Sequence, residues 1–246
     1  MNISAIALKL SIFLQRFPII HDSARRVYCI FRPGMRFFIE RSFCKFDEVF
    51  VLKIGANDGI ENDPLAEFLL NDKRYRGVLV EPIPLYAKML SKNYDWTGRF
   101  KIEQAAITAE DRNLLMYYID AEDADLKEHA IPDWLRGVAS LDRGHVEKHL
   151  PPEMHRLIRQ TKVDCLSVAS LLARNQVCKV DLLQIDTEGC DFVILKQFNL
   201  SVLRPKVIIF ERKHLSPKDD LDAKIYMEEA GYEVKILETD FLCLAH

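Results

Sequence analysis

Acidic side chains and a glycine-bracketed turn stand where apolar, strand-like runs of this sequence end. The turn G-A-N-D-G (residues 55–59) follows the run VFVLKI, and Glu81 follows the run GVLV. Asp186 and Glu188 follow a third such run, VDLLQI. A glycine turn lets a ligand approach backbone N–H groups without meeting a Cβ atom, and a carboxylate after the second strand can accept hydrogen bonds from both hydroxyls of a ribose. These residue types and spacings predict a nucleoside-binding site.

The composition of the turn argues against a ligand that places a phosphate there. NAD enzymes carry the fingerprint G-x-G-x-x-G, whose second glycine admits a pyrophosphate. Asn57 occupies that position here, and Asp58 would repel an anion but attract a cation. S-adenosylmethionine carries both an ammonium and a sulfonium group, so it is the nucleoside cofactor that the turn favours. A nucleotide- or NAD-binding Rossmann-type oxidoreductase is the alternative on a similar sheet.

Strand and helix patterns alternate along most of the chain and would bring these residues together. We expect strands at 49–54, 76–81, 100–107, 112–119, 181–186 and 205–212, helices at 63–71, 84–90, 167–173, 192–198 and 221–230, and an antiparallel hairpin at 232–246. Such alternation predicts a mostly parallel, doubly wound α/β sheet, which binds ligands beyond the carboxyl ends of its strands. With its reversed C-terminal strand, this sheet would be the Rossmann-like sheet of class I methyltransferases.

One long polar stretch interrupts the alternation. Residues 120–160 contain three prolines and four histidines, which are His129, His145, His149 and His155. A stretch of this length between regular elements is usually a functional lid or disordered. We therefore expect an insertion or lid at about 120–160, within a cofactor-binding domain that spans residues 46–246.

Residues 1–45 differ from the rest of the chain in charge. The whole chain has a formal net charge of −3 and a pI near 6.2, which argues against a nucleic-acid-binding protein. The first 45 residues nevertheless hold eight basic residues against Asp22 and Glu40. Residues 3–17 also carry an apolar helical face, which leaves two interpretations open. This basic extension either packs on its own domain or makes peripheral contact with a membrane surface.

Cysteine usage and hydropathy bear on where the protein acts. The six cysteines form no C-x-x-C pair, which favours a reducing, cytoplasmic setting. No apolar run reaches the length that is needed to span a bilayer. A non-catalytic interaction module that works through the basic extension is a further alternative to an enzyme. The oligomeric state stays open.

Six motifs, in order over residues 49–245, resemble those of FkbM-family methyltransferases. They are LKIGANDG, VLVEP, AAI, ASL, DLLQIDTEGCDFVIL and VIIFER. The resemblance implies an S-adenosylmethionine-dependent O-methyltransferase that acts on a hydroxyl of a sugar, a glycolipid or another small polar metabolite. The acceptor class comes from the resemblance alone.

The resemblance also assigns expected roles to residues of the motifs. Gly55, Ala56, Asn57, Asp58 and Gly59 would line the methionine part of the cofactor. The ribose would lie at Glu81 and Pro82, and the adenine at Ala105 and Ala106. Ser140 is a further cofactor candidate, and Asp186 would lie beside the transferred methyl group.

Methyl transfer to an alcohol needs in-line positioning of oxygen, carbon and sulfur, and a group that takes the hydroxyl proton. Glu188 is our first choice for this base, with Asp186 and His145 as further catalytic candidates. Glu211 and His149 are also available as proton acceptors, and so is His214, which lies just past the strand that ends near Glu211. Mg²⁺ held by Asp186, Glu188 and Glu211 is an alternative, but no metal spacing rule is met and no metal ligand is predicted.

Two of these residues have a structural interpretation of comparable weight. Asp58 could cap the following helix. Glu188, which precedes Gly189, could be a turn carboxylate stabilised by the dipole of the following helix.

Overall fold

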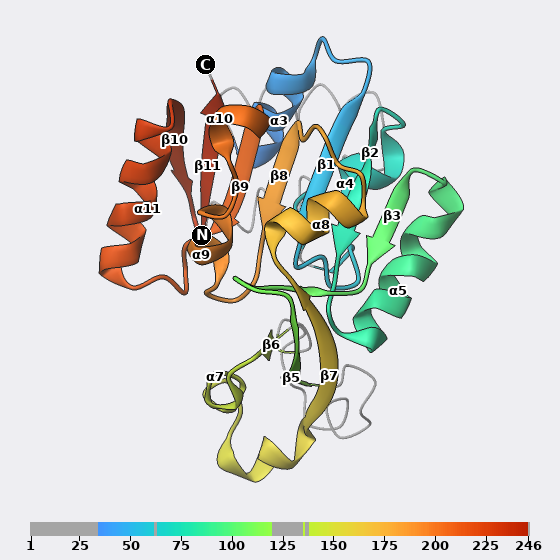
Figure 1. Ribbon diagram of the computed structural model, residues 1–246, viewed down its shortest axis with the longest axis vertical. Helices are drawn as coiled ribbons and strands as arrows, with labels where there is room; N and C mark the ends of the chain where they lie inside the picture. Colours follow the sequence, from blue (N-terminus) through green and yellow to red (C-terminus); the bar gives the residue numbers. More distant parts are fainter. Residues whose placement is uncertain (1–33, 62, 120–134, 136–137, 246) are drawn as a thin grey trace, which may run out of the picture. The chain divides into compact units, whose positions relative to one another are not determined.

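The computed structural model describes residues 34–61, 63–119, 135 and 138–245 of the chain (Figure 1). It divides into two units, Met1–Cys44 and Lys45–His246. The described part of the first unit is the helix α3 (Met35–Phe43), which is stabilised by an ion pair between Arg36 and Glu40, one helical turn apart. The helix predicted at residues 3–17 lies outside the described residues, so the expectation of membrane contact stays a prediction.

A seven-stranded sheet forms the centre of the second unit. Its strands are β1 (Val49–Ile54), β2 (Tyr75–Val80), β3 (Phe100–Glu103), β8 (Leu182–Ile185), β9 (Val207–Glu211), β10 (Tyr232–Leu237) and β11 (Asp240–Ala245). They lie in the order β10-β11-β9-β8-β1-β2-β3. All neighbours are parallel except β11, which is antiparallel to β9 and β10. The expected doubly wound, mostly parallel sheet with a C-terminal antiparallel hairpin is confirmed.

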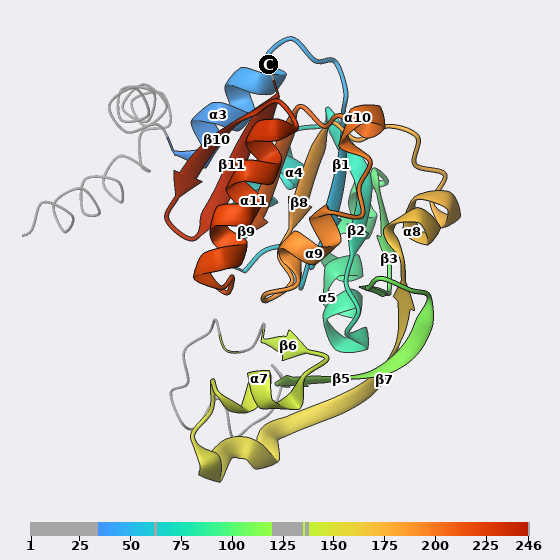
Figure 2. The ribbon, with the colours of Figure 1, turned by 60° about the vertical axis from the view of Figure 1, so that its left-hand side comes forward.

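Helices cover both faces of this sheet (Figure 2). They are α4 (Ala66–Asn71), α5 (Pro84–Tyr94), α8 (Val168–Arg174), α9 (Asp191–Leu195), α10 (Leu200–Leu203) and α11 (Pro217–Glu229), with a 3-10 turn, η1 (Asp95–Thr97), after α5. Leu171 of α8, Ile194 of α9 and Met227 of α11 share one buried core with Leu52 and Leu183 of the central strands. This core holds β1 and β8 in place, and the candidate site lies at their carboxyl ends.

The helix expected at 192–198 ends already at Leu195. Two other helices begin several residues from their expected starts. The helix predicted at 63–71 begins at Ala66, because the Asp63 side chain instead accepts a hydrogen bond from the Leu65 N–H (2.9 Å) and forms a turn. The helix predicted at 221–230 begins already at Pro217, since the Ser216 hydroxyl accepts from the Asp219 N–H and proline suits the first helical position.

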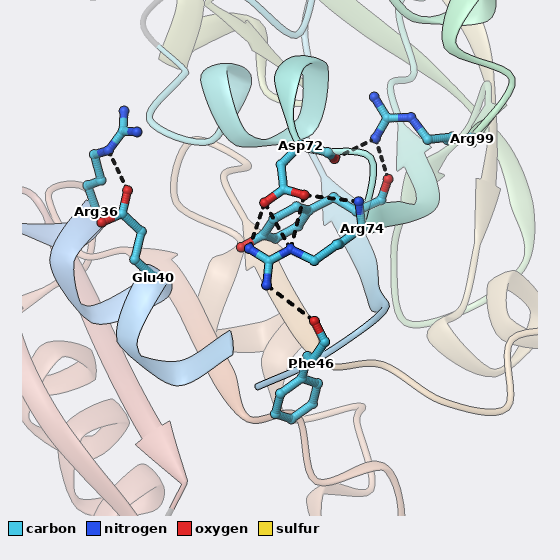
Figure 3. Close-up of polar contacts among 7 residues, drawn as sticks. Arg36, Glu40, Phe46, Asp72, Arg74 and Arg99 are labelled. Atoms are coloured by element: carbon cyan, nitrogen blue, oxygen red, sulfur yellow. Dashed lines mark hydrogen bonds and ion pairs between the residues drawn. The ribbon is translucent and has the colours of Figure 1, made fainter. Parts of the chain in front are cut away.

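The turn that leads into β2 is fixed by arginine side chains. Arg74 forms an ion pair with Asp72 (2.7 Å) and donates to the Phe46 carbonyl, while Arg99 donates to the Asp72 carbonyl (Figure 3). The hydrogen bond from Arg74 is the main cause that lowers the pKa of Asp72. These contacts fix the start of the strand that ends at Glu81.

A second, four-stranded sheet lies beyond the carboxyl ends of the central strands (Figures 1 and 2). It consists of β4 (Ala106–Ile107), β5 (Arg112–Ile119), β6 (Ala139–Ser140) and β7 (Ile158–Leu166), in the order β4-β7-β5-β6. β5 and β7 pair antiparallel from Arg112 opposite Cys165 to Ile119 opposite Ile158. The helix α7 (Arg143–Glu147) and the 3-10 helix η3 (Pro152–Leu157) lie between β6 and β7 and form a small core with Ile119.

The second sheet changes two expectations. The strand predicted at 100–107 is two strands in different sheets, because the chain turns at Gln104 and the Ala105 N–H donates to the Glu103 carbonyl (3.2 Å). The polar stretch at 120–160 is regularly folded over residues 138–160, while residues 120–134 and 136–137, with His129, lie outside the described residues. Its role as a lid stays a prediction. No helix in the described ranges is long and apolar enough to cross a membrane.

Candidate active site

The glycine turn joins the ends of three strands. The N–H groups of Gly55 and Ala56 both donate to the Val80 carbonyl at the end of β2 (3.0 and 2.9 Å), and the Asp186 N–H donates to the Ile54 carbonyl (2.9 Å). Gly55 has φ +79°, and a Cβ there would lie 1.7 Å from the Asp186 carbonyl oxygen. Only glycine fits this position, because the backbones after β1 and β8 are in direct contact.

Glu81 supports the glycine turn from the end of β2. Its carboxylate accepts hydrogen bonds from the N–H groups of Asn57 and Ile83, each at 2.9 Å. The side chain is almost fully buried, and this burial raises the pKa of Glu81 to about 7. A carboxylate oxygen can accept more than one hydrogen bond, so each oxygen retains capacity for a ribose hydroxyl.

Asp58 and Gly59 make local contacts within the turn. Asp58 Oδ1 accepts from the N–H groups of Ile60 and Glu61, both at 2.9 Å. These bonds close a turn and do not cap the following helix as expected, because α4 begins only at Ala66 and has no side-chain cap. Gly59 packs against α5: its carbonyl accepts from the Tyr94 hydroxyl, and a Cβ would lie 2.5 Å from the Tyr94 ring. Neither residue lines the cavity described next. Their contact with the cofactor stays a prediction.

A cavity of about 470 Å³ lies between the glycine turn and the second sheet. This volume is within the range of small-molecule sites. The site residues predicted from the sequence that line it are Gly55, Ala56, Asn57, Glu81, Pro82, Ala105, Ala106, Ser140, Asp186 and Glu188. The structure therefore gathers most of the predicted cofactor residues around one space, with His145 outside its lining.

The Asp-Thr-Glu-Gly turn after β8 is organised by a buried acid, Asp191. Its carboxylate accepts hydrogen bonds from the N–H groups of Thr187 and Gly189, both at 3.2 Å. Burial raises the pKa of Asp191 to about 7. Glu188 lies inside this turn with φ +54°, in the left-handed region that non-glycine residues rarely adopt. The turn holds Glu188 in this strained conformation, which is typical of functional sites.

Carboxylates dominate the charge around the cavity. Burial is the main cause that raises the pKa of Glu188 to about 7, of Glu211 to about 9 and of Asp240 to about 6, and the negative charge of Asp186 adds to each shift. Asp186 is exposed to the cavity but largely surrounded by protein, which raises its own pKa. Such a site fits a ligand with positive charge, as the sulfonium and ammonium groups of S-adenosylmethionine would supply.

A buried ion pair, absent from the sequence-based site, lies on the cavity wall. Lys53 Nζ contacts Asp63 Oδ1 (3.0 Å) and donates to Gln184 Oε1 (2.8 Å), and the side chains of Lys53 and Asp63 are 3% and 4% exposed. The signal was available: Lys53 interrupts an otherwise apolar strand, and Gln184 interrupts the neighbouring one at the paired register position. This ion pair connects β1 and β8 to the loop before α4.

Histidines lie near Glu188 on the side of the second sheet. His214 Nε2 lies 3.1 Å from Glu188 Oε2 and 3.8 Å from Glu211 Oε1. The rings of His145 and His149 stack edge to face with that of His214, with centroids 5.6 and 6.0 Å away. Burial is the main cause that lowers the pKa of both His149 and His214. His214, which was only an available group in the sequence, is thus the residue that directly contacts the predicted base.

Comparison with known proteins agrees with this geometry. The family model described as Methyltransferase FkbM domain matches residues 53–234. No curated protein matches the chain.

Solved structures similar to the chain include methyltransferases of diverse kinds. The methyltransferase FkbM from Methylobacillus flagellatus KT is 12% identical with a TM-score of 0.48, over 80% of this chain and 43% of that one. The Methanococcus jannaschii fibrillarin pre-rRNA processing protein is 13% identical with a TM-score of 0.42, over 81% and 67% of the chains. Precorrin-6y C5,15-methyltransferase from Geobacter metallireducens GS-15 is 12% identical with a TM-score of 0.40, over 84% of both. The chain thus spans less than half of the first of these structures.

The residues matched by the family model include the glycine turn, Glu81, the Asp-Thr-Glu-Gly turn after β8 and the turn after β9. They also include most of the sheet that positions these residues. The order of its central sheet is Rossmann-like, and the chain belongs to the FkbM methyltransferase family.

Proposed function

We propose that this methyltransferase acts on a hydroxyl oxygen of a small polar acceptor such as a sugar or glycolipid, with Glu188 as the general base. The observation that carries the proposal is the environment of Glu188. It lies on the cavity wall after β8, and its pKa, raised to about 7, is suited to taking a proton near neutral pH.

S-adenosylmethionine, when bound, would supply the methyl carbon on a sulfonium leaving group. The glycine turn and Glu81 would hold its nucleoside and methionine parts, and Asp186 would favour its positive charge. Binding there aligns the reacting atoms, which is the main contribution of an enzyme to a displacement at carbon.

The proton of the acceptor hydroxyl would pass to a carboxylate oxygen of Glu188. His214 supports this role, because its Nε2 lies 3.1 Å from Glu188 Oε2 and can donate a hydrogen bond to it. That bond keeps the carboxylate oriented and leaves the other oxygen for the acceptor. Ser140 and Asp142, from the second sheet and the start of α7, lie on the same cavity and would contact the acceptor or the cofactor.

The proposal predicts that Glu188→Gln keeps cofactor binding and loses turnover. Binding of S-adenosylhomocysteine would be measured by calorimetry, and methyl transfer by mass spectrometry over a panel of sugars and glycolipids. We expect kcat to fall by about 10²-fold or more, the usual contribution of a general base, with Kd changed by less than about threefold. In the wild type, kcat should rise with pH through about 7 as the base loses its proton.

A matched control is Glu110→Gln, since Glu110 is an exposed carboxylate in the turn before β5. It should change neither quantity. Full turnover in Glu188→Gln would remove Glu188 as the base, and methylation of a nitrogen rather than an oxygen in the product would remove the proposed acceptor class.

A further inference from the structure

Three histidines from distant parts of the chain cluster beside Glu188. His145 lies on α7 and His149 just after it, whereas His214 lies in the turn after β9. The ring centroids of His145 and His149 are 5.1 Å apart, and His214 completes the cluster. Histidines gathered in this way, next to a carboxylate, are a recurrent arrangement in metal sites.

The donor atoms are already close to the spacing of metal ligands. One ligand atom each from His145, Glu188 and His214 can be chosen so that all three lie within 4.8 Å of one another, and the pair from Glu188 and His214 is 3.1 Å apart. Ligand atoms bound at about 2.1 Å around one cation lie roughly 3 to 4 Å apart. A side-chain adjustment of less than 1 Å, on the order of ordinary thermal motion, would bring the widest pair into this range.

Two buried atoms in the cluster point to a missing ligand. His145 Nε2 and Glu211 Oε2 are both buried and have no hydrogen-bond partner among the described residues. Buried polar atoms are almost always paired, so each exception needs an explanation. A cation bound beside His214 would lie near both groups, because the His145 ring centroid is 5.6 Å from that of His214 and Glu211 Oε1 lies 3.8 Å from His214 Nε2.

We propose that His145, Glu188 and His214 bind a divalent transition metal ion of the Zn²⁺ type, with Glu211 adjacent to His214 at the edge of the site. Two imidazoles and one carboxylate form the ligand set of many catalytic zinc sites, in which the remaining position is open to water or substrate. Mg²⁺ prefers oxygen ligands throughout. The proposed site therefore differs from a magnesium site at Asp186, Glu188 and Glu211.

The location of the site indicates what the metal would do, and this step rests on the proposed function. Glu188 and Glu211 also line the cavity, so the ion would lie on the wall of the space that receives the acceptor. An open metal position there would bind the acceptor hydroxyl and lower its pKa as a Lewis acid. With the ion bound, the metal would replace the hydrogen bond between His214 and Glu188, and Glu188 would bind it through one oxygen and accept the proton on the other. The metal would also tie α7 to the turns after β8 and β9.

Calorimetric titration of the metal-stripped full chain with Zn²⁺ tests the proposal. The wild type should bind one Zn²⁺, and His145→Ala and His214→Ala should each weaken binding by about 10²-fold or more, since loss of an outer-shell partner alone costs 10- to 100-fold. Mg²⁺ should not compete. The matched control is His155→Gln, because His155 Nε2 lies 3.1 and 3.2 Å from the carbonyl oxygens of Glu147, at the end of α7, and Leu150, and His155 is not a proposed ligand.

A second measurement guards against variants that fold poorly. S-adenosylhomocysteine affinity of His145→Ala and His214→Ala should stay within about threefold of the wild type, while the visible absorption of bound Co²⁺ is lost. Absence of Zn²⁺ binding by the wild type, or equal loss in His155→Gln, would overturn the metal site. Failure of the wild type to bind S-adenosylhomocysteine would instead overturn the proposed function and leave the zinc result standing.

Discussion

At the scale of single residues, Lys53 is the clearest case of a polar side chain fixed by the site. It lies near the end of β1, whose other residues are all apolar. Its charge is paired with Asp63, and its ammonium group also donates to Gln184. A buried ion pair is costly to desolvate, and a mutation that removes only one partner leaves an uncompensated charge. The pair of Lys53 and Asp63 lies on the cavity wall, where it holds the loop before α4 against β1 and β8. This positioning of the cavity wall explains why a costly buried pair is present.

Lys53→Met should therefore destabilise the second unit strongly. We expect the free energy of unfolding, from urea titration, to fall by about 3–5 kcal/mol, the usual cost of breaking a buried pair. The double variant Lys53→Met with Asp63→Asn should recover part of this loss, because it removes the stranded negative charge.

The control for this change is Lys218→Met, which removes an exposed ion pair with Asp222. Exposed pairs contribute at most about 1 kcal/mol. A single Lys53→Met variant as stable as this control would show that the buried pair does not support the fold.

Residues that follow strands could be predicted from the sequence, and residues that meet across elements could not. Glu81 and Asp186 were found because the carboxyl ends of parallel strands converge at one edge. His214 and His145 are far apart in sequence, and their approach depends on where α7 folds back, which no local pattern encodes. The strand that contains Lys53 was predicted correctly, but its buried ion pair with Asp63 was not. A single lysine in an apolar run does not indicate which residue will pair with it.

At the scale of elements, the turn after β1 is a self-supporting unit. Asp58 accepts from two backbone N–H groups, Asn57 Oδ1 accepts from the Asp58 N–H, and Glu81 holds the Asn57 N–H from the neighbouring strand. Tyr94 of α5 donates to the Gly59 carbonyl. The shape of the turn is thus fixed by contacts within the protein.

The turn allows charge and hydrogen bonding to be separated at Asp58. Asp58→Asn keeps the oxygen that accepts from Ile60 and Glu61, whereas Asp58→Ala removes it. We expect the alanine variant to lose about 1 kcal/mol of unfolding free energy, as for a lost cap, and the asparagine variant to stay within about 0.5 kcal/mol.

Calorimetry with S-adenosylmethionine completes the comparison at Asp58. A purely structural role in the turn predicts that asparagine leaves the Kd nearly unchanged. A tenfold weaker Kd in Asp58→Asn would instead show that the carboxylate acts on the ligand through its charge.

Elements with strong local signals were predicted well, and those defined by long-range pairing were not. β1, β9 and α5 have apolar runs or a proline start that local rules capture. The break between β3 and β4 lies inside one strand-like stretch, FKIEQAAI, and only pairing with β7 assigns the second half to another sheet. β7 begins in a polar stretch, so its sequence alone does not indicate a strand. Its side chains find their neighbours only through antiparallel pairing with β5.

At the scale of the whole second unit, the crowded carboxylates affect stability as well as binding. Folded-state pKa values near 7 for Glu81 and Glu188 and near 9 for Glu211 lie above those of an unfolded chain. Between the unfolded and folded pKa values the folded protein holds more protons than the unfolded one, so stability falls as pH rises. His149 and His214 have lowered pKa values and act in the opposite sense, but only below about pH 6.5.

The ligand-free protein should therefore lose stability between pH 7 and pH 9. We expect a fall in Tm on the order of 5 °C by calorimetry, since one pKa unit corresponds to about 1.4 kcal/mol and a chain of this size shifts about 2–4 °C per kcal/mol. Glu211→Gln removes the group with the highest raised pKa and should flatten this dependence. A Tm that rises over this range would contradict the assignment of these carboxylates as strained by burial and repulsion.

The same charges should make the protein distinguish the methylated cofactor from its product. S-adenosylmethionine differs from S-adenosylhomocysteine by the methyl group and the positive charge on sulfur, while the ammonium and carboxylate are common to both. As Glu188 and Glu211 ionise, attraction to the sulfonium grows and the affinity for the product does not.

We expect the ratio of the two Kd values, measured by calorimetry from pH 6 to pH 9, to shift by about tenfold in favour of S-adenosylmethionine, as one pKa unit of differential interaction would give. Asp186→Asn should reduce the shift, because Asp186 is the charge common to the raised pKa values around the cavity. A ratio that stays constant with pH would mean that the sulfonium lies away from these carboxylates, and the cofactor would then have to bind with its sulfur on the opposite side of the cavity.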